Sequence, residues 1–139
     1  MRDDLIKAKQ ALSECHACAV CRGGELYTAD GRGIAPLLSL IEQLKDLHGY
    51  SAADRVIGSA AAYLMAEAGV EEAYAATTSE GALRIFAKNG VTVSYSTLTD
   101  KIMNRRGDGL CPMEEKALTM DSPEGAYRIF RARLDQISK

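Results

Sequence analysis

The densest group of reactive side chains lies in residues 104–114, which read Asn-Arg-Arg-Gly-Asp-Gly-Leu-Cys-Pro-Met-Glu. Periodicity is weak across this part of the chain, and long irregular segments often carry function. Pro112 favours the first position of a short helical turn, which makes Cys111 the N-cap of that turn. The helix dipole and the neighbouring arginines would then favour the reactive thiolate form of Cys111.

Two interpretations of this segment stay open. In one, Cys111 is the nucleophile or redox centre of a thiol-dependent enzyme, with Glu114 as a base and Arg105 as an anion clamp. In the other, Cys111 is a small buried hydrophobic residue, which is the commoner role of a free cysteine. No histidine lies near Cys111 in the sequence, so the segment by itself does not decide between them.

Polar residues at the predicted junctions between elements suggest anion binding. Ligands of α/β proteins collect at the carboxyl ends of strands, beside helix N-termini. Arg32 lies between two glycines, and Ser79 or Thr78 is the expected N-cap of the helix that follows. Asp54 and Arg55 fall in the first turn of a predicted helix that also contains Gly58. A solvated turn, ordinary capping and close packing are the corresponding structural explanations.

We therefore expect a metal-free pocket for a small anionic metabolite, with nucleotides among the candidates. Helix N-termini and paired arginines would meet there at one edge of a sheet. No cofactor is expected. The residues expected to bind the ligand are Arg32, Asp54, Arg55, Gly58, Ser79, Asn104, Arg105 and Arg106.

A cysteine-rich segment over residues 15–21, Cys-His-Ala-Cys-Ala-Val-Cys, resembles a set of zinc or iron–sulfur ligands. However, residues 16–22 have the pattern of a strand, in which successive side chains point to opposite faces. Cys15 and Cys21 would then point away from Cys18, and a second pair of closely spaced cysteines is missing. We expect structural thiols and no bound metal.

The composition excludes several classes of protein. The 139 residues fit one domain, 1–139, and 47% hydrophobic with 26% charged residues is typical of a globular protein. Seventeen basic and 19 acidic residues give a net charge of −2, which argues against a nucleic-acid polymer or an acidic membrane as partner. The absence of Trp and the 6% aromatic content argue against a base-stacking surface.

The chain shows no pattern of a secretory or membrane segment. Residues 1–4 are mostly charged, and the apolar-rich stretch 56–66 is interrupted and too short to cross a bilayer. Without a secretory signal, the four cysteines are more typical of free thiols or metal ligands than of a disulfide framework. We expect a cytoplasmic protein.

Local patterns predict the elements that position these residues. In the first half, residues 3–14 form a helix, and 16–22 and 24–29 form a hairpin with Gly23-Gly24 at its turn. An amphipathic helix follows, with Pro36 in its first turn and apolar residues between Leu37 and Leu44 on one face. Ser51 and Asp54 resemble a capping box for the next helix, 54–68.

The second half contains a strand–helix–strand unit, over 71–77, 80–88 and 91–96, and a last helix with Ser122 as its N-cap. Such a unit makes part of the sheet parallel. The order predicts an α/β fold, a three-layer α/β/α sandwich with a mixed sheet of about four or five strands.

Three landmarks resemble a small prokaryotic family of unknown function that has a cytidine-deaminase-like fold. They are Gly-Arg-Gly-Ile-Ala-Pro-Leu-Leu (31–38), Ala-Asp-Arg-Val-Ile-Gly-Ser-Ala-Ala-Ala (53–62) and the segment 104–114. The resemblance spans nearly the whole chain. It implies a deaminase-like arrangement of the predicted strands and helices, with which the element order is compatible.

The zinc-binding motifs of the catalytic deaminases are missing from this sequence. Those enzymes carry His-x-Glu at the start of the second core helix and Pro-Cys-x-x-Cys at the start of the third. Here Asp54-Arg55-Val56 and Ser79-Glu80-Gly81 stand near these places, and Cys111-Pro112 has the reverse order. We therefore expect no zinc-dependent deamination, and fold similarity alone does not assign a reaction. A homodimer joined through sheet or helix faces is a third alternative that needs no pocket.

Overall fold

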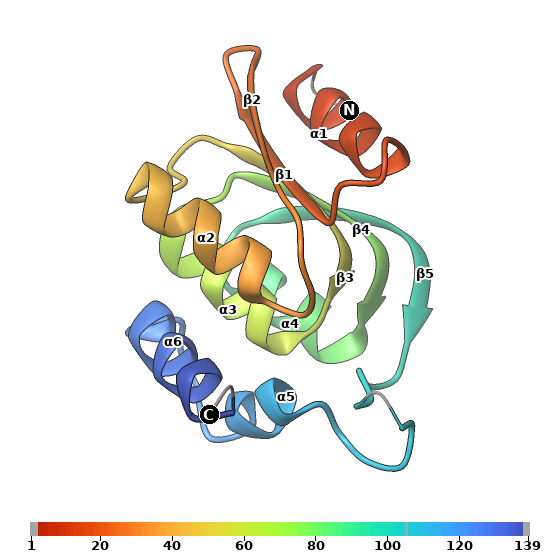
Figure 1. The fold of residues 1–139 in the computed structure, drawn as a ribbon, viewed down its shortest axis with the longest axis vertical. Coiled ribbons are helices and arrows are strands. Elements are labelled where there is room, and N and C mark those ends of the chain that lie inside the picture. The colour runs from red at the N-terminus through yellow and green to blue at the C-terminus, as the bar shows by residue number, and fades with distance from the viewer. Residues whose placement is uncertain (1–2, 105, 138–139) are drawn as a thin grey trace.

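The computed structural model describes residues 3–104 and 106–137, which form a five-stranded mixed sheet flanked by helices (Figure 1). The α/β class and the mixed sheet expected from the sequence are therefore confirmed. The elements, in chain order, are α1 (Asp3–Ser13), β1 (Cys18–Arg22), β2 (Glu25–Ala29), α2 (Ala35–Leu44), β3 (Ser51–Ile57), α3 (Ser59–Ala68), β4 (Glu72–Ser79), α4 (Glu80–Lys88), β5 (Thr92–Thr99), α5 (Pro112–Ala117) and α6 (Ala126–Ile137).

The strand order is β2-β1-β3-β4-β5. β1 is antiparallel to both β2 and β3, whereas β3, β4 and β5 run parallel to one another. The predicted hairpin is confirmed: Gly23 and Gly24 join β1 to β2 with φ of 59° and 84°, values that glycine adopts without strain. Because β3 and β4 are parallel, their carboxyl ends lie on the same side of the sheet, and the starts of α3 and α4 that follow them lie there too.

The two faces of the sheet are covered unequally. α1 packs on one face through a small cluster that includes Leu5, Ala8 and Tyr74. α2, α3 and α4 lie on the other face (Figure 1). Connections between parallel strands are right-handed, so the two successive crossovers β3-α3-β4 and β4-α4-β5 put their helices on the same side. The large hydrophobic core lies between these helices and the sheet.

α5 and α6 form an outer layer over α3 (Figure 1). Glu67 of α3 accepts hydrogen bonds from the backbone N–H groups of Gly125 (2.5 Å) and Tyr127 (2.7 Å), at the start of α6. Phe130 of α6 is fully buried in the core. No helix within the described ranges is long and apolar enough to cross a membrane.

The predicted helix over 54–68 is wrong in its first part. Asp54 and Arg55 lie in strand β3, and α3 begins only at Ser59. Gly58 is not inside a helix but is the N-cap residue, with an extended backbone. The error has a physical cause: alanine favours helices, yet Ala52 and Ala53 are fully buried because a central strand packed on both faces requires small side chains.

Other local predictions agree more closely with the structure. The strand–helix–strand unit is confirmed, with α4 at the predicted residues 80–88 and with β4 and β5 parallel. Residues 97–99 extend β5, which the sequence did not predict. The last helix starts at Ala126 rather than after Ser122, because Gly125 adopts a φ of 80° and interrupts the helical backbone.

Removing the Phe130 ring should detach α6 from the core. We expect Phe130→Ala to lower the free energy of unfolding by about 3–5 kcal/mol, as is usual for deletion of a buried aromatic side chain. Urea denaturation followed by circular dichroism measures the change. Ile137→Ala is the matched control, because Ile137 lies in the same helix and is 45% exposed. Equal, small effects of the two substitutions would show that α6 is not part of the cooperative core.

Candidate functional site

The start of α3 is capped by a carboxylate from a distant part of the chain. Glu114 of α5 accepts hydrogen bonds from the backbone N–H groups of Ser59 (2.7 Å, to Oε1) and Ala60 (2.9 Å, to Oε2). Glu114 is only 8% exposed. The first N–H groups of a helix have no partner within the helix, and the helix dipole favours negative charge there. The chain therefore supplies its own anion to this N-terminus.

Gly58 makes this contact sterically possible. A Cβ atom added at residue 58 would lie 2.6 Å from Oε1 of Glu114 and 2.7 Å from Oε2. The backbone φ of Gly58 is −93°, which any residue can adopt, so the requirement for glycine is space and not conformation. Glu114 was predicted as a base, and Gly58 as part of a ligand site. The structure places both at the start of α3, and their roles toward a ligand stay predictions.

α4 begins beside α3. Ser79 is the N-cap of α4, as predicted, and its hydroxyl accepts a hydrogen bond from the backbone N–H of Ala82 (3.2 Å). A Cβ atom added at Gly81 would lie 2.6 Å from Oγ of Ser59. The first turns of α3 and α4 are thus in direct contact, although α3 starts at Ser59 and not at the predicted Ser51–Asp54.

A cavity of about 290 Å³ opens next to these helix starts. Two basic side chains line it from one side, Arg84 and Lys88, which are one helical turn apart on α4. Neither has an ion-pair or hydrogen-bond partner within the described residues. The remaining lining residues are Ser59, Tyr63, Gly81, Ile85, Asn89, Ala117, Leu118, Met120 and Asp121.

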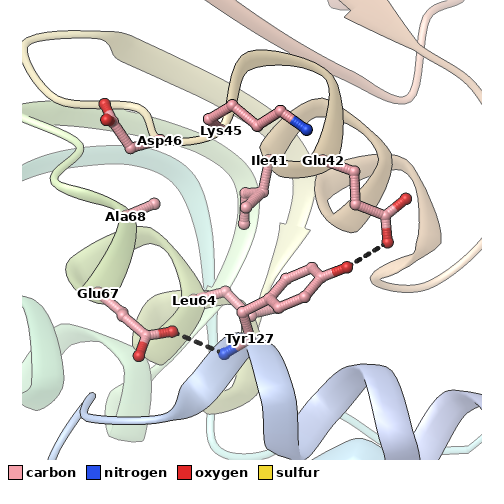
Figure 2. A pocket seen from close by; sticks show the side chains of 8 residues that line it. All are labelled: Ile41, Glu42, Lys45, Asp46, Leu64, Glu67, Ala68 and Tyr127. Atoms are coloured by element: carbon pink, nitrogen blue, oxygen red, sulfur yellow. Dashed lines mark hydrogen bonds between the residues drawn. The ribbon is translucent and has the colours of Figure 1, made fainter.

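A second cavity, of about 380 Å³, lies between α2, α3 and α6 (Figure 2). Its carboxylates are already bound within the chain. Glu42 accepts hydrogen bonds from the Tyr127 hydroxyl (2.5 Å) and from Arg131 (3.1 Å), and Glu67 caps α6. These hydrogen bonds lower the pKa of Glu42, because they stabilise its ionised form. The cavity follows the seam where α6 packs on the core and is a poor place for an anion.

Asp54 is buried inside the sheet, beside the thiol of Cys18. The two residues are opposite each other on β3 and β1, and their exposed fractions are 6% and 0%. Burial raises the pKa of Asp54 to about 7, against the smaller opposing effects of backbone N–H groups and of the Cys18 thiol. Burial, and then the Asp54 charge, raise the pKa of Cys18. Asp54 lines neither cavity, so a ligand contact at this residue stays a prediction.

Those predicted arginine and asparagine ligands that the structure describes are not gathered at the helix starts. Arg55 donates hydrogen bonds to the backbone carbonyls of His16 (3.1 Å) and Leu12 (3.4 Å), which tie the end of α1 to β3. Arg32 and Arg106 are exposed in loops, and Arg105 lies outside the described residues. None of the described ones lines either cavity.

The loop that contains Asn104 is held together by its own polar groups. The amide of Asn104 donates to Asp108 (3.0 Å), and its side-chain oxygen accepts from the backbone N–H of Gly107 (2.9 Å). Met103 and Leu110 form an isolated β-bridge at its base. These contacts give Asn104 a structural role within the loop.

The cysteines occupy separate environments. Cys111 is the N-cap of α5, as predicted, and packs half-buried against the core; its role as a nucleophile stays a prediction. Cys18 and Cys21 belong to hydrophobic clusters on opposite faces of the sheet, as the strand pattern predicted, and Cys15 is exposed. Among residues 3–104 and 106–137, no group of three or more Cys, His, Asp or Glu residues is placed to hold a metal ion.

The basic pair of the cavity was missed in the sequence. Arg84 and Lys88 have the i, i+4 spacing that places two side chains on one helix face, and this signal was available. Leu118 and Asp121, in contrast, reach the cavity only because α5 docks on α3. No local sequence pattern predicts such a long-range contact.

The fold and the cavity define a class: a mixed α/β domain whose parallel strands lead into two adjacent helix starts, flanked by a basic cleft. Residues 7–134 match the TM1506 family, described as a domain of unknown function (DUF1893), and the chain belongs to this family. The crystal structure of a DUF1893 family protein (TM1506) from Thermotoga maritima is similar in fold. It has 22% sequence identity and a TM-score of 0.84, over 96% of this chain and 92% of that one. No curated protein matches significantly.

Substitution of Gly58 should act through Glu114. We expect Gly58→Ala to reduce the free energy of unfolding by about 1–3 kcal/mol, because the new methyl group displaces the carboxylate. Glu114→Ala should cost a similar amount, since it leaves buried N–H groups without a partner. In the Glu114→Ala background the effect of Gly58→Ala should nearly vanish. Denaturant unfolding of the four proteins measures the coupling, and strictly additive losses would contradict the steric role of Gly58.

The stability of the protein should depend on pH through Asp54. Between about pH 4 and pH 7, the unfolded chain releases a proton that folded Asp54 retains, so this residue lowers stability as the pH rises. One carboxyl whose pKa moves from 3.8 to about 7 accounts for ~4 kcal/mol over that interval, and for no further change above it.

Asp54→Asn keeps the side-chain size and removes the titration. We therefore expect the free energy of unfolding of Asp54→Asn to rise relative to wild type as the pH increases through this interval, as measured by urea denaturation at several pH values. Asp100→Asn, at an exposed acid, is the control. Parallel pH profiles for Asp54→Asn and wild type would show that folded Asp54 titrates normally.

Proposed function

We propose that this DUF1893 protein binds a small phosphorylated or otherwise anionic metabolite, with nucleotides among the candidates, in the cleft between α3, α4 and residues 117–121. The observation that supports this is the pair Arg84 and Lys88, which share one face of α4, line the cavity and have no acidic partner among the described residues. Basic side chains without partners are the groups that bind phosphate and carboxylate ligands.

The capped helix start determines where the anionic group would bind. Glu114 already accepts hydrogen bonds from the Ser59 and Ala60 N–H groups, so these donors are not free for a ligand. Arg84 and Lys88 lie beside this point and offer positive charge instead. The Ser59 hydroxyl lines the same cavity and adds a hydrogen-bonding group.

Apolar side chains that line the cleft fit the uncharged part of such a ligand. They are Ile85, on the same helix as the basic pair, and Leu118 and Met120, from the segment after α5. Asp121 supplies acceptor oxygens for ligand hydroxyl groups. A volume of about 290 Å³ is just below the range of about 300–1,000 Å³ seen for ligand pockets, so the proposed ligand is small.

We also infer a cytidine-deaminase-like fold for the domain. The adjacent starts of α3 and α4, after the parallel strands β3 and β4, support this inference, because the zinc motifs of the deaminases stand at two such helix starts. Those motifs are replaced here by Gly58-Ser59 and Ser79-Glu80, so the proposed binding needs no metal. All four cysteines are free thiols, which supports the proposed cytoplasmic location.

Anions should stabilise the protein through Arg84 and Lys88. We expect millimolar adenosine monophosphate or ribose 5-phosphate to raise the melting temperature of the wild type, because a ligand that binds only the native state increases its stability. Arg84→Gln with Lys88→Gln should abolish the shift. Differential scanning fluorimetry, with isothermal titration calorimetry for any positive compound, measures the effect.

The control is Lys101→Gln with Arg128→Gln, which also removes one lysine and one arginine charge, but at exposed positions outside both cavities. This variant should respond to the ligands like wild type. Equal loss of binding in both double variants would indicate a general charge effect. The absence of any shift in the wild type with phosphate, phosphosugars and nucleotides would overturn the proposed function.

A further inference from the structure

The edge strand β5 lacks the protection usual for an exposed edge. β5 pairs only with β4, so its outer edge presents backbone N–H and C=O groups that no other strand in the described part of the chain binds. Its residues, Thr-Val-Ser-Tyr-Ser-Thr-Leu-Thr, include no charge, proline or glycine. Soluble proteins usually block long edge strands with lysine, proline, a bulge or a covering element.

The opposite edge of the sheet differs in length and in charge. β2 has five residues against eight in β5 and begins with the charged Glu25. The sheet thus has one blunted edge and one edge that is long, uncharged and rich in residues that favour strands. This asymmetry indicates that β5 is normally covered.

The side chains of β5 also leave apolar surface and a polar atom without a partner. Tyr95 and Leu98 are 42% and 43% exposed, and strand alternation places them on opposite faces of the sheet. The hydroxyl oxygen of Ser94 is buried and has no hydrogen-bond partner in the described ranges. Buried polar groups are normally satisfied, so this atom favours an additional strand beside β5.

We propose that β5 pairs with β5 of a second copy of this chain, antiparallel about a two-fold axis, so that two sheets become one continuous sheet. A second copy is the occupant that the strand itself fits. With the axis at Tyr95, Ser94 lies opposite Ser96 of the second copy, and Val93 lies opposite Thr97. Thr92 and Leu98 then also face each other, so no apolar side chain is opposite a charge.

In the two-fold arrangement, the open β5 edges of both copies pair with each other. Each copy contributes the same strand, so the assembly closes at two chains and exposes only the two blunted β2 edges. The Ser94 hydroxyl gains a partner in Ser96 of the second copy, and the two Tyr95 rings meet across the axis. This proposal does not depend on the anion-binding cleft.

Lysines on β5 should separate the dimer. We expect wild type at micromolar concentration to sediment as a species of twice 15.0 kDa, and Tyr95→Lys with Thr97→Lys to sediment as a monomer with an unchanged circular-dichroism spectrum. Like charges opposite each other across a strand pair are unfavourable, which is why the substitution is placed there. The matched control is Ala132→Lys with Ile137→Lys on α6, where Ile137 is 45% exposed, and it should remain dimeric.

Hydrogen exchange on the unmodified protein provides a second measurement, which does not require that the lysine variant fold. Backbone N–H groups of β5 should exchange more slowly as the protein concentration rises across the dissociation range, whereas those of β2 should not change. A wild type that stays monomeric at the highest concentration overturns the proposal. So does a dimer that resists the β5 lysines, or assembly beyond two chains.

Discussion

The contact between the Glu114 carboxylate and the start of α3 holds the C-terminal third of the chain over the core. Glu114 lies 55 positions after Ser59 and 54 positions after Ala60 in the sequence, so no local preference can replace this contact. Each partner needs the other: the first N–H groups of a helix have no internal acceptor, and a buried carboxylate without donors is costly. α5 is only six residues long, so its place depends on this contact and on Met113 and Ala117, which are buried in the core.

This contact also shapes the chemistry at the carboxyl edge of the sheet. In α/β proteins the helix starts at this edge are the usual place for an anion. Here Glu114 occupies one of them, and the Ser79 hydroxyl caps the other. Positive charge beside these helix starts comes from two side chains on α4, Arg84 and Lys88. In the proposed site, the groups that bind the anion are therefore side chains of a helix and not backbone N–H groups.

The parts of the fold that local patterns encode could be predicted from the sequence. α2 and the β4-α4-β5 unit follow from proline position, capping residues and alternation, all of which act within a few residues. β3 could not be recognised, because Ala52 and Ala53 have helical preference and become strand residues only through packing on both faces. The site shows the same difference between local and long-range signals. Ser79 could be predicted as a cap from its neighbours in the sequence, whereas the contact between Gly58 and Glu114 joins two separate elements and has no local signal.

α4 belongs to both surfaces that the structure points to. One flank carries Arg84 and Lys88 into the cleft, and the helix packs against β5, the strand at the open edge of the sheet. Pairing of β5 with a second copy would restrain this strand, and with it the helix that covers it. A basic pair on a more rigid helix loses less conformational freedom when it binds an anion, which favours affinity. Coupling between assembly and anion binding would therefore run through α4, with no change in the contacts of Glu114.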